Sequence, residues 1–315
     1  MPLSEFEIIR QIFQQQKVDR NDVLLGIGDD AAVTKVPEGH ELALAMDTLI
    51  GGVHFPENMK PADIGYRSLA VNLSDLAAMG AEPAWVTLAL TIPESNESWL
   101  RAFASGLMSL AAQYNLQLIG GDMTRGALSI TVQVHGFLPT KQILVRSGAH
   151  PGDSIYITGT LGDAAAGLAS WQQTDKSFAW LKQRFTRPVP RIEAGFALRG
   201  IATSVIDVSD GLIADLGHIL ESSNVGAKLK MANLPLSLAI CEKFDLEQAR
   251  EMALSGGDDY ELCFTAPSNK QEQISKLVKV CQFVEIGVIE AEPGLRCLLP
   301  DGAQYDSVGS GFQHF

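Results

Sequence analysis

Apolar residues recur along the chain in runs whose spacing alternates between that of helices and that of strands. Ser4 and Glu7 form an S-x-x-E capping box, and the apolar residues of positions 6–13 recur at helical spacing. Spacing of the same kind predicts helices over 61–79 and 97–114. Strands are predicted at 42–46, 85–92, 116–119 and 128–134. The first looks buried and delivers Asp47 at its end, and the last alternates as a half-exposed antiparallel strand does.

The alternation of strands and helices restarts after residues 146–153, whose composition is typical of a linker or wide turn. Strands are predicted at 154–158, 204–208, 260–265 and 284–289, and helices after 159–162, over 212–220 and over 271–280. A chain of 315 residues is long enough for two cores. We therefore predict a mixed α/β fold with an N-terminal domain over 1–140 and a C-terminal domain over 141–315.

Composition narrows the class of protein. Hydrophobic residues make up 46% of the chain and charged residues 19%, as in globular proteins. The net charge is -13 without a Lys/Arg run, which argues against a nucleic-acid surface. No apolar stretch approaches the ~20 residues of a membrane-spanning helix, and the first residues are acidic where a signal peptide is basic. With four cysteines that show no paired spacing, we expect a cytoplasmic protein without a membrane partner.

Aspartate stands beside glycine in four separate clusters, at 28–30, 120–122, 209–211 and 256–259. Asp47 and Asp75 lie among similarly small residues. Any one cluster is as readily a turn or a helix cap, because Asp and Gly are common there. Together they favour ligand binding, since carboxylate oxygens suit Mg²⁺ and glycine lets the backbone approach a phosphate closely. We interpret them as a Mg²⁺-nucleotide site assembled from distant parts of the chain.

Other motifs are absent or ambiguous. The chain has no P-loop, no Rossmann fingerprint, no Ser-His-Asp or Cys-His arrangement and no zinc-type cluster. The turn at 159–162 either holds an anion at a helix N-terminus or is an ordinary strand-to-helix turn. His54 is equally readable as a core histidine or as a ligand contact. Arg125 and Arg146 either grip a phosphate or form surface salt bridges.

Taken in order, these motifs resemble those of the thiamine-monophosphate kinase family, within the PurM-like superfamily of aminoimidazole ribonucleotide synthetase. The matching stretches span essentially the whole chain, at 28–32, 46–55, 72–81, 120–122, 207–212, 256–262 and 311–315. The resemblance implies a two-domain PurM-like fold, with an N-terminal mixed sheet used for homodimer formation and a C-terminal α/β domain. It also implies that ATP phosphorylates thiamine monophosphate to thiamine diphosphate by direct in-line transfer.

The resemblance also implies roles for individual residues. Several Mg²⁺ ions would be held by Asp30, Asp47, Asp75, Asp122, Asp207 and Asp210. ATP would contact Gly121, Asp122, Arg146 and Ser209. Thiamine monophosphate would contact His54, Asp258 and Phe312, whose ring offers a face to the cationic ring of the substrate. No base or nucleophile is implied.

The chain departs from the family pattern in three places, which involve four residues. Ala45 and Met46 stand where small hydroxyl residues usually precede the aspartate, so both are left out of the metal set. Asp258 replaces a usual Glu, and Phe312 replaces a Trp or Tyr. The alternatives are another ATP-using PurM-like enzyme, such as aminoimidazole ribonucleotide synthetase, and a non-catalytic Mg²⁺-nucleotide binder.

Overall fold

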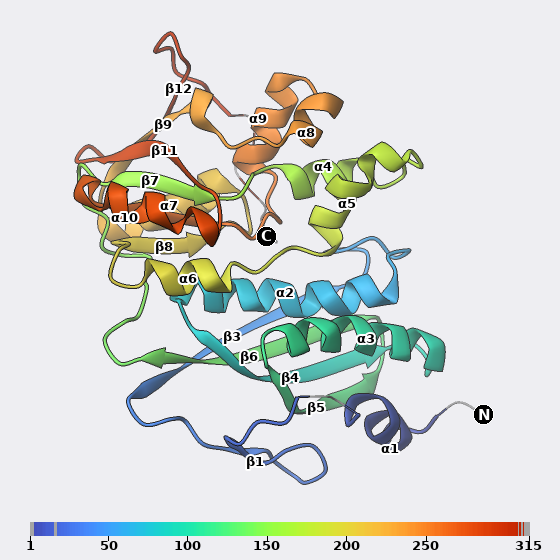
Figure 1. Cartoon of the computed structure of the whole chain (residues 1–315). Helices are drawn as coiled ribbons and strands as arrows, with labels where there is room; N and C mark the ends of the chain where they lie inside the picture. Colours follow the sequence, from blue (N-terminus) through green and yellow to red (C-terminus); the bar gives the residue numbers. More distant parts are fainter. Residues whose placement is uncertain (1–2, 16–17, 308, 310, 312–315) are drawn as a thin grey trace. The chain divides into compact units, whose positions relative to one another are not determined.

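The computed structural model describes residues 3–15, 18–307, 309 and 311. The chain forms two compact units (Figure 1). The first comprises Met1–Leu76 and Ala81–Lys141, and the second comprises Ala77–Gly80 and Gln142–Phe315. Each unit has its own sheet and its own helices.

The first unit is built on a four-stranded mixed sheet whose strand order is β3, β6, β4, β5. The strands are β3 (His40–Ile50), β4 (Glu82–Ile92), β5 (Gln117–Arg125) and β6 (Ser129–Pro139). Only β4 and β5 are parallel. The helices α2 (Pro61–Met79) and α3 (Glu97–Gln113) cover one face of the sheet (Figure 1). The remaining elements are α1 (Glu5–Ile8), a π-helix (Ile9–Phe13), β1 (Val23–Leu25) and β2 (Val33–Thr34).

Two glycines let α2 and α3 pack closely. A Cβ atom added at Gly65 would lie 2.1 Å from the Phe103 carbonyl oxygen, and one added at Gly106 would lie 1.8 Å from that of Ala62. Any side chain at either position would therefore push the helices apart. This contact sets where α2, which carries Asp75, lies over the sheet.

Two strands that carry predicted site residues differ from the sequence prediction. The strand expected at 42–46 is not buried, since Leu44 and Met46 are 55% and 61% exposed. It also continues through Asp47 to Ile50, because β6 pairs with it along its whole length. Likewise β5 continues through Gly120–Asp122, where parallel pairing with β4 holds the glycines extended. Asp47 and Asp122 therefore lie inside strands and not at their ends.

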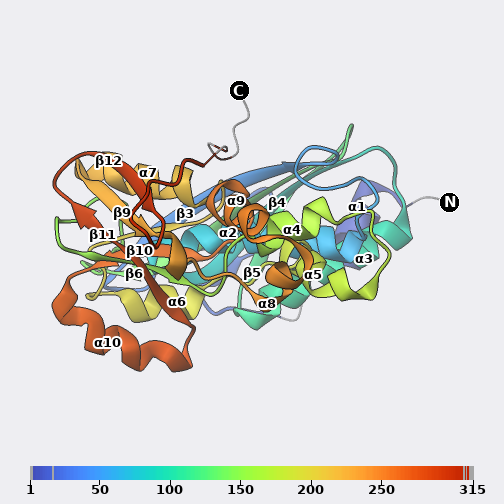
Figure 2. The ribbon, with the colours of Figure 1, turned by 90° about the horizontal axis from the view of Figure 1, so that it is seen from above.

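The second unit is built on a six-stranded mixed sheet whose order is β12, β9, β11, β7, β10, β8. Its strands are β7 (Ser154–Thr158), β8 (Ser204–Asp207), β9 (Gly226–Lys230), β10 (Leu262–Ala266), β11 (Phe283–Glu290) and β12 (Gly294–Leu298). Its α-helices are α4 (Asp163–Ala169), α5 (Ala179–Thr186), α6 (Ile192–Leu198), α7 (Leu212–Ser223), α8 (Leu238–Lys243), α9 (Leu246–Ser255) and α10 (Gln271–Lys276). Figure 2 shows α7 and α10 on opposite sides of this sheet. Short 3-10 turns span Lys176–Phe178, Met231–Asn233, Ser268–Lys270 and Leu277–Lys279.

The core of the second unit joins the sheet to α7. Leu212, Leu216 and Ile219 are fully buried against Ile157 and Cys263. Sequence periodicity predicted the strands that carry these contacts but not β9, β12, α5, α6, α8 or α9, which are short and weakly patterned. Within the described residues, no helix combines the length and the apolar character needed to cross a membrane.

Candidate active site

On the β3 side of the first unit, a buried asparagine ties the strand to α2. The backbone N–H of Asp47 donates to Asn72 Oδ1 over 2.9 Å, and Asn72 Nδ2 donates to the Ser68 carbonyl over 3.0 Å. Asp75 follows Asn72 by three residues, so it lies one turn further on the same side of α2. Asp47 and Asp75 are both half-buried. The structure thus brings these two predicted metal ligands to one place.

His54 lies in the turn that follows β3. Its Nδ1 accepts a hydrogen bond of 2.9 Å from the Ile50 backbone N–H. An acceptor role at Nδ1 leaves the proton of a neutral ring on Nε2, where it can be donated to a phosphate oxygen. The half-buried ring is therefore oriented by the chain, as a ligand contact requires.

On the β5 side, the first unit has a cavity of about 960 Å³. Asp30, Gly121 and Asp122 line it, and both aspartates are exposed. Gly121 has a φ of +154°, and a Cβ atom there would lie 1.9 Å from the Leu88 carbonyl oxygen. The apolar wall of the cavity includes Phe6, Ile9, Phe13, Ile27, Leu88, Leu118 and Ile119.

Asp47 and Asp75 lie at the β3 edge of the sheet, whereas Gly121 and Asp122 lie on β5 at the opposite edge. Asp47 pairs with Val132 on β6, Val132 pairs with Leu88 on β4, and Leu88 pairs with Gly121 on β5. Three strand spacings separate Asp47 from Gly121, or about 14 Å. In the described part of the chain, no three His, Cys, Asp or Glu side chains gather closely enough to hold a metal ion. One chain therefore does not bring Asp47 and Asp122 to the same cation.

In the second unit, Asp215 organises the loop that carries Ser209 and Asp210. Its Oδ2 accepts from the backbone N–H groups of Ser209, Asp210 and Gly211 over 3.0, 3.0 and 3.1 Å. Burial, and then the charge of Asp207, raises the pKa of Asp215 to about 7. Asp207 and Asp210 therefore lie near enough to Asp215 for their charges to act on it.

Asp210 is not a helix cap. Gly211 occupies the N-cap position of α7, with a φ of +120° and no side-chain cap. The cluster does lie at the start of α7, but the alternative that Asp210 caps this helix is wrong. Asp207, the last residue of β8, is buried, whereas Asp210 is half-buried.

The loop at 256–261 runs beside the Ser209 loop. The Asp258 N–H donates to the Ser209 carbonyl over 2.8 Å, and the Tyr260 N–H donates to that of Val208 over 2.8 Å. Ser209, Asp210 and Asp258 are thereby brought together. Arg146 is exposed and follows Val145, whose carbonyl accepts from the Val205 N–H of β8 over 2.8 Å.

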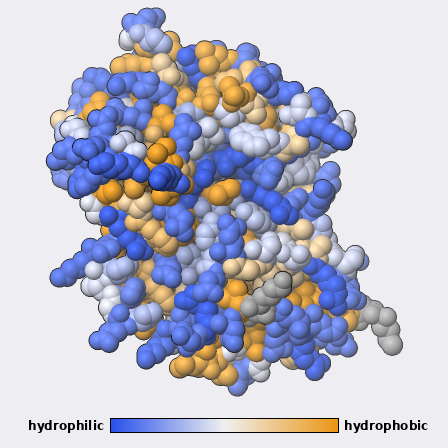
Figure 3. Space-filling view, viewed as in Figure 1, coloured by the Kyte–Doolittle hydropathy of each residue, from blue (hydrophilic) through white to orange (hydrophobic). Residues whose placement is uncertain are grey.

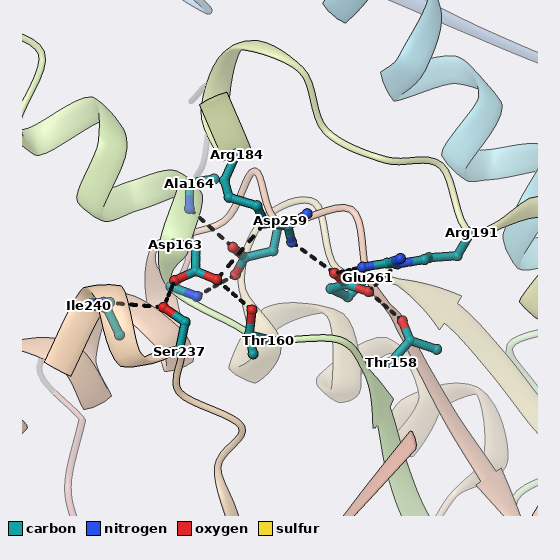
Figure 4. A network of polar contacts seen from close by, with 11 residues as sticks. Thr158, Thr160, Asp163, Ala164, Arg184, Arg191, Ser237, Ile240, Asp259 and Glu261 are labelled. Carbon is teal, nitrogen blue, oxygen red and sulfur yellow. Dashed lines mark hydrogen bonds and ion pairs between the residues drawn. The ribbon is translucent and has the colours of Figure 1, made fainter. Parts of the chain in front are cut away.

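Beside this loop lies a network of polar contacts (Figure 4). It consists of three acids and two arginines: Asp163, Asp259, Glu261, Arg184 and Arg191. Glu261 accepts from Arg184, Arg191 and Thr158 over distances of 2.5–2.8 Å. Asp259 accepts from the Gly162 and Ala164 N–H groups over 2.7 and 3.3 Å. The N-terminus of α4 is thus occupied by the chain's own carboxylate, so the turn at 159–162 is an ordinary strand-to-helix turn.

Sequence reasoning missed several residues that shape the site. Asp215 lies outside every motif, and Asp259 and Glu261, although they lie inside the 256–262 stretch, were given no role of their own. Phe6, Ile9 and Phe13 also line the cavity, but in the sequence their spacing indicated only a helix and no ligand contact. Phe312, predicted to contact the substrate, lies outside the described residues.

The donor atoms in both units suit Mg²⁺. Asp47, Asp75 and Asp122 of the first unit and Asp207 and Asp210 of the second all offer oxygen, the ligand type that Mg²⁺ prefers. Burial, and after it the charges of Asp207 and Asp210, raise the pKa of Asp215 beside them. The residues present therefore fit the predicted metal, and Ala45 and Met46 offer no side-chain oxygen to it.

Comparison with known proteins identifies the family to which the chain belongs. The AIR synthase related protein N-terminal domain matches residues 28–138, and the corresponding C-terminal domain matches residues 150–299. The thiamine-monophosphate kinase of Escherichia coli (strain K12) is 48% identical over 100% of this chain and 99% of its own length. The chain belongs to the thiamine-monophosphate kinase family.

Solved members of the thiamine-monophosphate kinase family share the fold. The enzyme from Stenotrophomonas maltophilia K279a is 45% identical over 97% of this chain and 99% of its own, with a TM-score of 0.89. A structure described as AaThiL complexed with AMPPCP and TMP is 32% identical over 100% and 99% of the two chains, with a TM-score of 0.79. The predicted mixed α/β, PurM-like fold is confirmed.

Proposed function

We propose that the chain transfers the terminal phosphoryl group of ATP to thiamine monophosphate, giving ADP and thiamine diphosphate. The observation that carries the proposal is the full-length similarity to a relative complexed with AMPPCP, an analogue of ATP, and TMP. The acidic residues of both units are those that the sequence assigns to the triphosphate and its cations.

The chain's residues are suited to positioning. Thiamine monophosphate already presents a phosphate oxygen that is largely ionised at neutral pH, since its second pKa is about 6. A general base is therefore unnecessary, and the residues need only hold two anions in line. Mg²⁺, when bound, neutralises the negative charge between them. We propose that His54 Nε2–H donates to the acceptor phosphate and that Asp258 meets the cationic part of the substrate.

We propose that ATP binds on the β5 side of the first unit. Gly121 and Asp122 stand at the rim of the cavity, and its apolar wall of Phe6, Ile9 and Phe13 suits a purine base. Arg146 and Ser209 of the second unit are proposed to contact the phosphates, and Phe312 the thiamine ring. The metal set stays as predicted, with Asp30, Asp47, Asp75, Asp122, Asp207 and Asp210.

We also propose that the chain forms a homodimer through β3. Leu42, Leu44 and Met46 are exposed on one side of this edge strand. Hydrophobic residues that reach the surface among hydrophilic ones are visible in Figure 3. A long exposed edge strand with an apolar row is a liability unless another chain covers it.

A dimer would also bring Asp47 and Asp75, at one edge of the sheet, close to an Asp122 side chain. If β3 of one copy meets β5 of the other, Asp47 and Asp75 of one copy approach Asp122 of its partner. Mixing Asp47→Asn with Asp122→Asn protein would then give mixed dimers with one intact site each. Half the dimers are mixed and half of their sites are intact, so about a quarter of wild-type activity should return. If the mixture stays as inactive as each variant, the sites are not shared.

The proposed reaction is tested by product analysis. Purified protein, Mg²⁺ and ATP are incubated with thiamine monophosphate or with free thiamine, and the products are separated by chromatography. Thiamine diphosphate should form from the monophosphate alone. If neither acceptor gives product, formylglycinamidine ribonucleotide tests the alternative of an aminoimidazole ribonucleotide synthetase. ATP turnover that depends on the acceptor excludes a non-catalytic nucleotide binder. The cytoplasmic location and the division at residues 140–141 stay predictions.

A further inference from the structure

The segment 257–260 holds a backbone conformation that side chains normally oppose. φ is +64° at Asp258 and +52° at Tyr260, next to +66° at Gly257. Left-handed backbone is uncommon outside glycine and exceptional for a bulky aromatic residue. It persists only where the surrounding contacts over-determine it. The contacts that do so are on both sides of the segment.

Asp259 and Glu261 fix one side. Asp259 is 2% exposed and accepts from the Gly162 and Ala164 N–H groups at the start of α4. Glu261 is fully buried, with Arg191 bound to both of its oxygens over 2.6 and 2.5 Å (Figure 4). A carboxyl group so held cannot leave without exposing its buried partners unpaired.

Backbone hydrogen bonds fix the other side. The Asp258 and Tyr260 N–H groups donate to Ser209 and Val208, and the Val208 N–H donates back to the Glu261 carbonyl over 2.7 Å. Gly257 is required here, because a Cβ atom would lie 2.6 Å from the Ser209 carbonyl oxygen. The segment is thus held between the α4 side and the loop that carries Ser209 and Asp210.

This anchoring leaves Asp258 and Tyr260 paired. The Tyr260 hydroxyl donates to Asp258 Oδ1 over 3.2 Å. The Tyr260 ring is buried, at 8% exposure, so the hydroxyl has little freedom to move away. Asp258 is only half-buried, so its carboxylate stays accessible to a ligand.

We propose that Tyr260 is a positioning residue for the substrate, whose hydroxyl holds the Asp258 carboxylate toward the cationic group of thiamine monophosphate. Asp259 and Glu261 hold the backbone beneath that pair. The inference rests on the proposed function, in which Asp258 contacts thiamine monophosphate. It assigns Tyr260 to recognition of this substrate and not of ATP.

A double-mutant cycle tests the inference. Tyr260→Phe, Asp258→Asn and the double variant are compared with wild type, and Tyr156→Phe serves as a matched control. Tyr156 is also buried, and its hydroxyl lies 3.5 Å from Glu285 on the sheet, away from Asp258. For each protein, KM is measured for both substrates, and the Kd for thiamine monophosphate is measured by equilibrium dialysis.

Tyr260→Phe should raise KM and Kd for thiamine monophosphate about fivefold, the usual effect of one hydrogen bond. KM for ATP should be unchanged, and Tyr156→Phe should behave as wild type. In the Asp258→Asn background, Tyr260→Phe should add almost nothing, because the hydroxyl acts through that carboxylate. A purely structural role would instead give the same effect in both backgrounds.

Three results would overturn the inference: no change in Tyr260→Phe, an equal rise in KM for ATP, or full additivity with Asp258→Asn. Should Tyr260→Phe fold poorly by thermal unfolding, Asp259→Asn takes its place in the cycle, with the same expected coupling to Asp258→Asn. Absence of thiamine diphosphate from the wild-type reaction would refute the proposed function itself. That outcome is distinct, because the three results above require a wild-type enzyme that turns over.

Discussion

Acidic residues near glycine occur in both units, yet their surroundings divide them into two kinds. Asp30 and Asp122 of the first unit are exposed at the cavity on the β5 edge. Asp259 and Glu261 of the second unit are buried, and their oxygens accept from backbone N–H groups, arginines and a threonine. The exposed carboxylates are available to a ligand, whereas the buried carboxylates hold segments of the fold together.

The glycine-aspartate pattern therefore identifies a site but does not distinguish the carboxylates that can contact a ligand from those that support the fold. In the 256–261 segment the two kinds stand next to each other. Asp258 is half-buried beside the Ser209 loop, while Asp259 points into the buried network. Burial with full hydrogen bonding, and not residue type, separates support from ligand contact.

The largest expected effect comes from removing one of the buried carboxylates. Glu261→Ala leaves Arg184 and Arg191 beside a cavity without their carboxylate, and should lower the free energy of unfolding by about 3–5 kcal/mol. Urea denaturation followed by circular dichroism measures it. Asp30→Ala, in the exposed group, is the control and should unfold like wild type. Equal stability of Glu261→Ala and wild type would show that the network does not support the fold.

Removing an exposed carboxylate should lower turnover and leave stability unchanged. Asp122→Asn removes a charge from the cavity rim and should lower kcat about a hundredfold or more, as losing a transition-state contact does. Its thermal unfolding midpoint should match that of wild type, since the side chain is exposed. Steady-state kinetics and a thermal melt on the same preparation give both values. Wild-type turnover in Asp122→Asn would remove this residue from the metal set.

A smaller effect should appear in the pH dependence of stability. Burial raises the pKa of Asp259 from 3.8 to about 8 in the folded protein. A raised carboxyl pKa stabilises the fold below the unfolded pKa, and this contribution is lost as the pH rises toward 8. Asp259→Asn cannot ionise, so its stability relative to wild type should rise between pH 4 and pH 8. A pH-independent difference in urea midpoints would contradict this assignment.

The sequence was enough to predict most of the framework. Long patterned helices such as α2 and α3 have close to their predicted bounds, because their apolar periodicity continues through tertiary packing. The strand predicted at 128–134 is less well bounded, since β6 continues to Pro139. It failed at β3, where Leu42, Leu44 and Met46 form a row typical of a buried strand but are exposed on an edge. An apolar row identifies a face that needs covering without identifying what covers it.

The candidate site could be predicted in part. The Asp–Gly motifs named the residues, but the separation of Asp47 from Asp122 depends on strand order, which no local pattern carries. The support that Asp215 and Asp259 give arises from contacts with backbone N–H groups 4–97 residues away in sequence. The local pairings of Asp215 and the long-range pairings of Asp259 alike leave no periodic trace in the chain.

The most direct test of the proposed function follows the phosphoryl group itself. ATP labelled in its γ-phosphate is incubated with the protein, Mg²⁺ and thiamine monophosphate, and the label is located by chromatography and on the denatured protein. The account predicts label in the terminal phosphate of thiamine diphosphate and none bound covalently to the chain. Label on the protein would contradict direct transfer. Label confined to inorganic phosphate would contradict thiamine monophosphate as the acceptor.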